Sequence, residues 1–141
     1  MVRPGGSIYL LGWSSQQLLP GYPFLEARLN ATCSAYLPYL QDRAPELHFT
    51  RALGQMRRAG LVEVQAQTYA GQVQAPLSGD ETAALVSLFE MLWGQPQLGV
   101  SQEDWQAYRR LCDPESPDFI PKAEGYYALF TITVFRGNTP L

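Results

Sequence analysis

Residues 126–135 constrain the fold more than any other part of the chain, because their sequence, YYALFTITVF, is rich in aromatic and β-branched side chains and carries no charge. Such side chains favour strands, and a strand without charge suits the middle of a sheet. The segment therefore predicts a central strand, which needs a neighbouring strand on each side and helices to cover its faces.

Two other segments have strand patterns. Residues 7–13 form a nearly continuous apolar run between a proline-glycine stretch and a serine-glutamine stretch. This is typical of a strand buried on both faces, as in parallel sheets flanked by helices. Residues 61–69 alternate apolar and polar side chains, and this period of two predicts a strand with one exposed face or a place at the sheet edge.

Helical patterns fill the intervals between these strands. Residues 23–37 place apolar side chains at helical spacing behind a proline that suits a first helical turn, and residues 45–60 end at a glycine that suits a left-handed cap. Ser78 and Glu81 form a capping-box pattern, and residues 101–112 predict a shorter helix. The order strand, two helices, strand, two helices, strand predicts an α/β fold.

Length and charge exclude several classes of protein. The 141 residues are enough for one domain or part of one. A net charge of −3 and a pI near 5.0 exclude the basic surface of a nucleic-acid binder. With Lys122 as the only lysine and no long apolar stretch, we expect no membrane association. The two distant cysteines, Cys33 and Cys112, and the absence of a secretory signal pattern predict a cytoplasmic location.

Three segments carry a resemblance to a known family. Residues 1–10, MVRPGGSIYL, resemble the start of the fifth strand of class I S-adenosylmethionine-dependent methyltransferases. Residues 45–64 are similar to the following helix and sixth strand, and residues 126–136 to the antiparallel seventh strand, which lies between the fifth and the sixth. The resemblance covers the whole chain but only the C-terminal half of the family's domain.

The resemblance implies a fold and a domain organisation. The fold would be the C-terminal part of a Rossmann-like methyltransferase, with flanking helices and a three-stranded mixed sheet in the spatial order first, third, second strand. Residues 1–141 would form a single or partial domain, and residues about 78–113 would be a helical insertion into it.

The implied activity is transfer of a methyl group from S-adenosylmethionine to a small-molecule acceptor. In the family, a glycine-rich loop and an acidic residue in the first strands hold the cofactor, whereas the twelve glycines of this chain include no G-x-G pair. We therefore expect the cofactor-binding half to be absent from this chain, which alone would be inactive and would supply the acceptor side.

The resemblance also leaves the first strand without its family neighbour. An edge with apolar residues and unpaired backbone groups invites a partner. That partner is a complementing N-terminal half on another polypeptide, a second copy of the chain, or further residues of a longer gene product. The alternative function is a non-catalytic interaction module that associates through this edge.

Four candidate substrate-binding residues follow the first strand. Trp13, Ser14, Ser15 and Gln16 leave its carboxyl end, where open α/β sheets bind their ligands. They either line the acceptor pocket or form a polar strand-to-helix loop over a packed tryptophan.

Aromatic residues and one histidine complete the candidates. Tyr22 and Tyr36, with Tyr39 nearby, either form an aromatic wall around a hydrophobic acceptor or pack in the core. His48, the only histidine, excludes a multi-histidine metal site. It is either a general base or a solvated capping residue. Methyl transfer depends heavily on positioning, so the lack of a catalytic cluster does not oppose it.

Overall fold

A computed structural model describes residues 3–33, 44–95 and 99–141. Its strands are β1 (Ser7–Gln17), β2 (Val62–Gln74) and β3 (Tyr127–Asn138), and its α-helices are α1 (Pro23–Thr32), α3 (Ala52–Arg58), α4 (Gly79–Trp93) and α5 (Gln102–Cys112). Short 3₁₀ helices occupy Pro45–Leu47, Phe49–Arg51 and Ile120–Lys122. The predicted alternation of strands and helices is therefore present in the described part of the chain.

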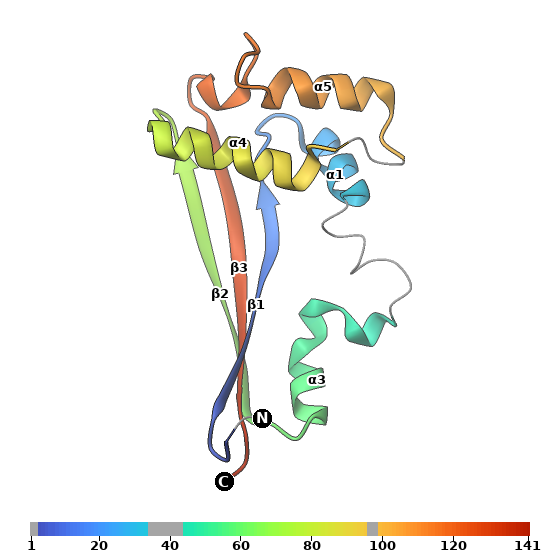
Figure 1. Ribbon diagram of the computed structural model, residues 1–141, viewed down its shortest axis with the longest axis vertical. Helices are drawn as coiled ribbons and strands as arrows, with labels where there is room; N and C mark the ends of the chain where they lie inside the picture. Colours follow the sequence, from blue (N-terminus) through green and yellow to red (C-terminus); the bar gives the residue numbers. More distant parts are fainter. Residues whose placement is uncertain (1–2, 34–43, 96–98) are drawn as a thin grey trace. The chain divides into compact units, whose positions relative to one another are not determined.

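The three strands form one sheet in the order β1-β3-β2 (Figure 1). This is the order first, third, second that the resemblance implies, and it places β3 in the centre and β2 at an edge. The sheet is antiparallel rather than mixed, because β3 runs opposite to both of its neighbours. The two outer strands point the same way but do not pair with each other.

Strand β1 departs from its prediction in two respects. The prediction of burial on both faces is wrong: β1 is the other edge of the sheet, and Tyr9, Leu10 and Leu11 are 53%, 41% and 67% exposed. An apolar run predicts burial only where strands pair on both sides of it, and β1 pairs with β3 alone in the described sheet. The strand also continues to Gln17, so that the predicted loop after Trp13 is extended backbone.

The chain divides into two compact units, and the first comprises residues 1–16, 39–71 and 130–141. Its small core consists of buried Ala52, Met56 and Phe135, with Ile8, Phe49, Leu53, Leu61 and Val64 partly buried around them. The ring of Phe49 meets Phe135 edge-on, with centroids 5.0 Å apart. Helix α3 thus packs its apolar stripe on one face of the sheet, as the spacing of these residues predicts.

The end of α3 confirms the predicted glycine cap. Gly60 has a φ of +82°. Its backbone N–H donates to the carbonyl of Arg57 at 3.0 Å, and the N–H of Leu61 donates to the carbonyl of Met56 at 3.1 Å. These two bonds form a Schellman motif, which satisfies the last carbonyls of the helix and turns the chain into β2.

The second unit comprises residues 17–38 and 72–129 and holds the larger core. Buried side chains from α1, α4, α5 and the segments around them form this core: Leu18, Leu19, Leu25, Leu29, Cys33, Leu85, Phe89, Leu92, Trp93, Tyr108, Leu111, Cys112, Phe119, Ile120, Tyr126 and Ala128. Arg28 on α1 and Asp104 on α5 join the two helices through two hydrogen bonds of 2.7 Å.

The capping box of α4 is also present in this second unit. The backbone N–H of Glu81 donates to the Ser78 hydroxyl at 3.2 Å, and the backbone N–H of Ser78 donates to the Glu81 carboxylate at 2.8 Å. Helix α4 therefore begins where the sequence pattern predicts. Over the described residues, none of the helices is long and apolar enough to cross a membrane.

Candidate functional site

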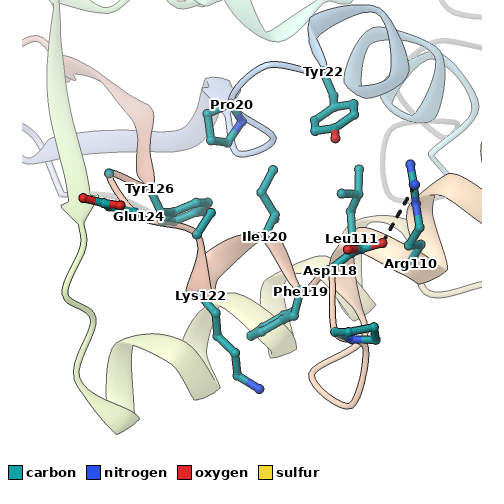
Figure 2. A pocket seen from close by; sticks show the side chains of 13 residues that line it. Pro20, Tyr22, Arg110, Leu111, Asp118, Phe119, Ile120, Lys122, Glu124 and Tyr126 are labelled. Atoms are coloured by element: carbon teal, nitrogen blue, oxygen red, sulfur yellow. Dashed lines mark ion pairs between the residues drawn. The ribbon is translucent and has the colours of Figure 1, made fainter.

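The candidate site is an open cavity of about 500 Å³ in the second unit, which we name the Tyr22 cavity. Pro20 and Tyr22, just after β1, form one wall, and Leu111, Ile120 and Tyr126 form the other. Figure 2 shows the Tyr22 ring reaching across the cavity, with its hydroxyl directed towards Leu111 and Ile120. Two apolar walls face each other across a space large enough for a small molecule.

A tight turn positions the first wall. Gly21 has a φ of +87°, and the backbone N–H of Tyr22 donates to the carbonyl of Leu19 at 2.9 Å. Proline followed by glycine at the two central positions is the pattern of a type II turn, whose third residue requires a positive φ. The turn places Pro20 and Tyr22 on the cavity, and Pro23 then begins α1.

The opposite wall is a 3₁₀ turn that leads into β3. Backbone N–H groups of Lys122 and Ala123 donate to the carbonyls of Phe119 and Ile120, both at 3.0 Å. Phe119 and Ile120 are buried. Because the turn is anchored in the core, the Ile120 side chain faces the cavity from a fixed position.

Leu18, next to the cavity, has both of its backbone groups satisfied by buried side chains. Its N–H donates to both carboxylate oxygens of Glu26 at 2.9 Å, and its carbonyl accepts a hydrogen bond of 3.0 Å from the Tyr126 hydroxyl. The N–H of Leu19 donates to the same carboxylate at 3.0 Å. These bonds fasten the turn to α1 and to the start of β3, and so hold both walls in place.

Burial changes the ionisation of these groups. Desolvation raises the pKa of the Glu26 carboxyl, although the hydrogen bonds from Leu19 and Leu18 oppose the rise. Desolvation also raises the pKa of the Tyr126 phenol and of the Cys112 thiol well above their usual values. Tyr126 and Cys112 are therefore neutral at pH 7, and the Cys112 thiol is a poor nucleophile.

Charged side chains lie at the rim of the cavity. Arg110 and Asp118 approach to 3.9 Å, and both side chains are more than half exposed. The Lys122 ammonium donates to the carbonyl of Pro114 at 3.1 Å and lies 5.5 Å from the ring centre of Phe119. Figure 2 shows Lys122 pointing away from the cavity. The lining of the cavity thus combines apolar side chains with charged ones.

This arrangement suits binding and orientation more than acid-base catalysis. The apolar side chains of the walls offer a bound molecule contact area, and the Tyr22 hydroxyl offers it one hydrogen bond. Across the described residues, no group of three or more histidine, cysteine, aspartate or glutamate side chains is placed to hold a metal ion.

The predicted residues of β1 lie in the first unit. Trp13 stacks on Phe130 of β3, with ring centroids 4.8 Å apart and an interplanar angle of 17°. The Ser14 hydroxyl lies 3.0 Å from that of Thr131 and accepts from that of Thr133 at 2.8 Å. The Ser15 hydroxyl lies 2.9 Å from that of Thr131. The serines therefore join β1 to β3 across the sheet.

The other candidates are distributed over both units. Gln16 lies in β1, half-buried, and Tyr22 lines the cavity with 40% of its surface exposed. Tyr36, together with Tyr39, falls outside the described residues. His48 is exposed in the first unit, where its Nδ1 accepts the backbone N–H of Thr50 at 3.3 Å as a cap.

Sequence reasoning missed most of the second wall. Leu111 and Ile120 are ordinary apolar residues in sequence, and only the fold brings them opposite Tyr22. The proline-glycine pair before Tyr22 is a sequence signal for the turn that forms the first wall. Glu124 and Tyr126, just before β3, also border the cavity.

No known protein family matches this chain, and no curated protein is significantly similar to it. The resemblance to methyltransferases therefore rests on the residue patterns, and the function rests on the chemistry of the cavity and the sheet.

Proposed function

We propose that this chain is the acceptor-binding half of a methyltransferase that uses S-adenosylmethionine, and that the Tyr22 cavity holds a small, largely apolar methyl acceptor. One observation carries the proposal: an open cavity of small-molecule size, with apolar side chains on two sides and charged ones among its lining, lies just past the carboxyl end of β1, between the turn that holds Tyr22 and the start of β3. In open, mostly parallel α/β sheets, ligands bind beyond the carboxyl ends of the strands.

The sheet gives a second line of support. Its order, β1-β3-β2 with an antiparallel central strand, is the arrangement of the last three strands in the resembled family. The exposed apolar residues of β1 are those that a further strand would cover. Both features are consistent with a chain that supplies one side of a larger sheet.

The described residues do not fit the cofactor itself. The backbone N–H groups of Leu18 and Leu19, which directly follow β1, are already bound by the Glu26 carboxylate. They are therefore not available to bind the nucleoside or the methionine carboxylate of S-adenosylmethionine. The chain also lacks the G-x-G pattern that brings backbone close to such a cofactor. We assign no cofactor contact to this chain.

The contribution of this chain would be positioning. Tyr22 and Ile120 would hold the acceptor between them, and the anchored walls would fix its orientation. Holding reactants in a productive geometry supplies several kcal/mol towards a displacement reaction, about 7–11 kcal/mol in the best oriented systems.

The test is a binding measurement on the chain, with small aromatic alcohols and amines as probes and nuclear magnetic resonance as the readout. We expect probe-dependent shifts at Tyr22, Leu111 and Ile120, and their loss in Tyr22→Ala. Tyr127→Ala is the matched control, because Tyr127 is 42% exposed, close to the 40% of Tyr22, and does not line the cavity. Shifts that Tyr22→Ala leaves unchanged would refute the assignment.

A second candidate function is association through the edge of β1. The observation that favours it is the exposure of Tyr9, Leu10 and Leu11 on an outer strand. Sedimentation of the chain tests it, since an interaction module of this kind should self-associate or bind a partner strand, whereas a monomer that takes up no partner would oppose it.

A further inference from the structure

We infer that β1 pairs with β1 of a second copy of the chain, antiparallel, with Leu10 opposite its own counterpart. The inference rests on the second candidate function, association through this edge, and is independent of the Tyr22 cavity. It adds to that function the partner, which is a second copy of the chain, and the register of the pairing, which is centred on Leu10.

The two edges of the sheet differ in chemistry. Strand β2 carries glutamine or glutamate at five of its positions, and Glu63 near its start has a φ of +52°, which distorts regular pairing. Strand β1 has eleven residues, none of them charged. Proteins protect exposed edges with charge and irregular backbone. Edge β2 has one charged side chain and one irregular backbone position, both at Glu63, whereas edge β1 has no charge, so β1 is the edge better suited to pairing.

The backbone of β1 offers free groups at the centre of the strand. Gly6 directs its carbonyl towards the backbone N–H of Thr139, just past β3, at 2.8 Å. Because backbone groups alternate sides along an antiparallel strand, those of Tyr9 and Leu11 turn away from β3. A neighbouring strand would form its hydrogen bonds with these two residues.

The side chains determine the register. A two-fold axis at Leu10 places Tyr9 opposite Leu11 of the second copy, and Leu11 opposite Tyr9. The free backbone groups of Tyr9 and Leu11 then exchange hydrogen bonds, and each ring packs on an aliphatic side chain, a favourable cross-strand pair. Leu10 meets its counterpart on the other face. The three most exposed apolar side chains of the strand centre are thereby covered together.

The occupant is a second copy because the strand matches itself. Antiparallel pairing of two uncharged strands brings no like charges together. The Arg136 guanidinium lies 5.8 Å from the centre of the Tyr9 ring and so holds its charge over its own sheet. Pairing with a complementing methyltransferase half would use the same edge, so the two arrangements exclude each other.

Disulfide trapping tests the register. Leu10→Cys should give a covalent dimer under mild oxidation, because Cα atoms of a directly opposed, non-hydrogen-bonded pair lie about 4.5 Å apart. Leu11→Cys is the control: the site is more exposed, at 67% against 41%, but the two residues would lie about 7–8 Å apart or more on the diagonal. The native thiols of Cys33 and Cys112 are buried.

Charge substitution tests the pairing without a cross-link. The wild-type chain should sediment with twice its monomer mass, whereas Leu10→Lys alone and Leu10→Glu alone should lose the dimer, and a mixture of the two should regain it as a heterodimer. Tyr69→Lys on β2, where the tyrosine is 53% exposed, should remain dimeric.

The experiments distinguish a wrong register from the absence of any association through β1. A wild-type dimer that Leu10→Lys leaves intact, or that Leu11→Cys cross-links in preference to Leu10→Cys, overturns the register but leaves association through another surface. A wild-type chain that is monomeric at every concentration overturns both the pairing and the second candidate function. Neither result tests binding at the Tyr22 cavity, whereas a confirmed β1 dimer would remove the exposed edge of β1 as support for a complementing methyltransferase half.

Discussion

The carboxylate of Glu26 accepts the backbone N–H of Leu18 with both of its oxygens, at 2.9 Å each. Only 4% of Glu26 is exposed, and the N–H of Leu19 donates to the same group. A side chain of α1 thus holds the end of β1 and the turn that presents Tyr22. The stability of the chain and the shape of its cavity therefore depend on one buried acid.

Glu26→Ala should lower the free energy of unfolding by about 2 kcal/mol or more, because it leaves two buried N–H groups without an acceptor. Denaturation by urea measures the change. Glu90→Ala, on the exposed face of α4, is the control and should have little effect. Equal losses in the two variants would show that the Glu26 bonds contribute nothing special.

The same residue predicts a pH dependence. Burial raises the pKa of Glu26 in the folded chain above its usual 4.5. A raised acid pKa means that its contribution to stability is largest below 4.5 and declines as pH rises through the folded value. Relative to Glu26→Gln, the wild-type chain should therefore lose stability as pH rises above 4.5. If the stability of the wild-type chain relative to Glu26→Gln instead increased as pH rises above 4.5, the raised pKa would be contradicted.

The pair between Arg28 and Asp104 predicts the opposite trend. Hydrogen bonding from Arg28 holds the pKa of Asp104 below its usual 3.8. Its contribution is present above pH 3.8 and is lost as pH falls through the lower folded value. Asp104→Asn should lower the unfolding temperature at pH 7, and the difference from wild type should vanish in acid. Asp118→Asn, in the looser exposed pair with Arg110, should change neither the unfolding temperature at pH 7 nor its dependence on pH.

Gly12 tests the packing of the first unit. A Cβ at this position would overlap the ring of Phe49, which is itself packed against Phe135. Gly12→Ala should cost about 1–3 kcal/mol in the free energy of unfolding. Gly79→Ala should be neutral or stabilising, since nothing lies within 4 Å of a Cβ there. Phe49→Leu should relieve part of the Gly12→Ala cost, and additive losses in the double variant would contradict the clash.

Local features of this chain could be predicted from its sequence. The Ser78 capping box and the Gly60 cap each depend on residues within a few positions of one another. The position of β3 also follows from its own composition. Each of these features needs no knowledge of distant segments.

Features that depend on distant segments could not be predicted in the same way. The apolar run of β1 suggested burial, but burial depends on a second neighbouring strand. Ser14 and Ser15 belong to a strand because Thr131, more than a hundred residues away, bonds to them. The Tyr22 cavity has one wall with a local turn signal and another that only the fold assembles.

A titration of the isotope-labelled chain tests the central claim most directly, with S-adenosylmethionine in one series and small aromatic acceptors in the other. We predict that the acceptors shift the resonances of Tyr22, Leu111 and Ile120 and that S-adenosylmethionine leaves the spectrum unchanged. Micromolar binding of S-adenosylmethionine, or acceptors that leave the resonances of these three residues unchanged, would contradict the proposal that this chain binds the acceptor and not the cofactor.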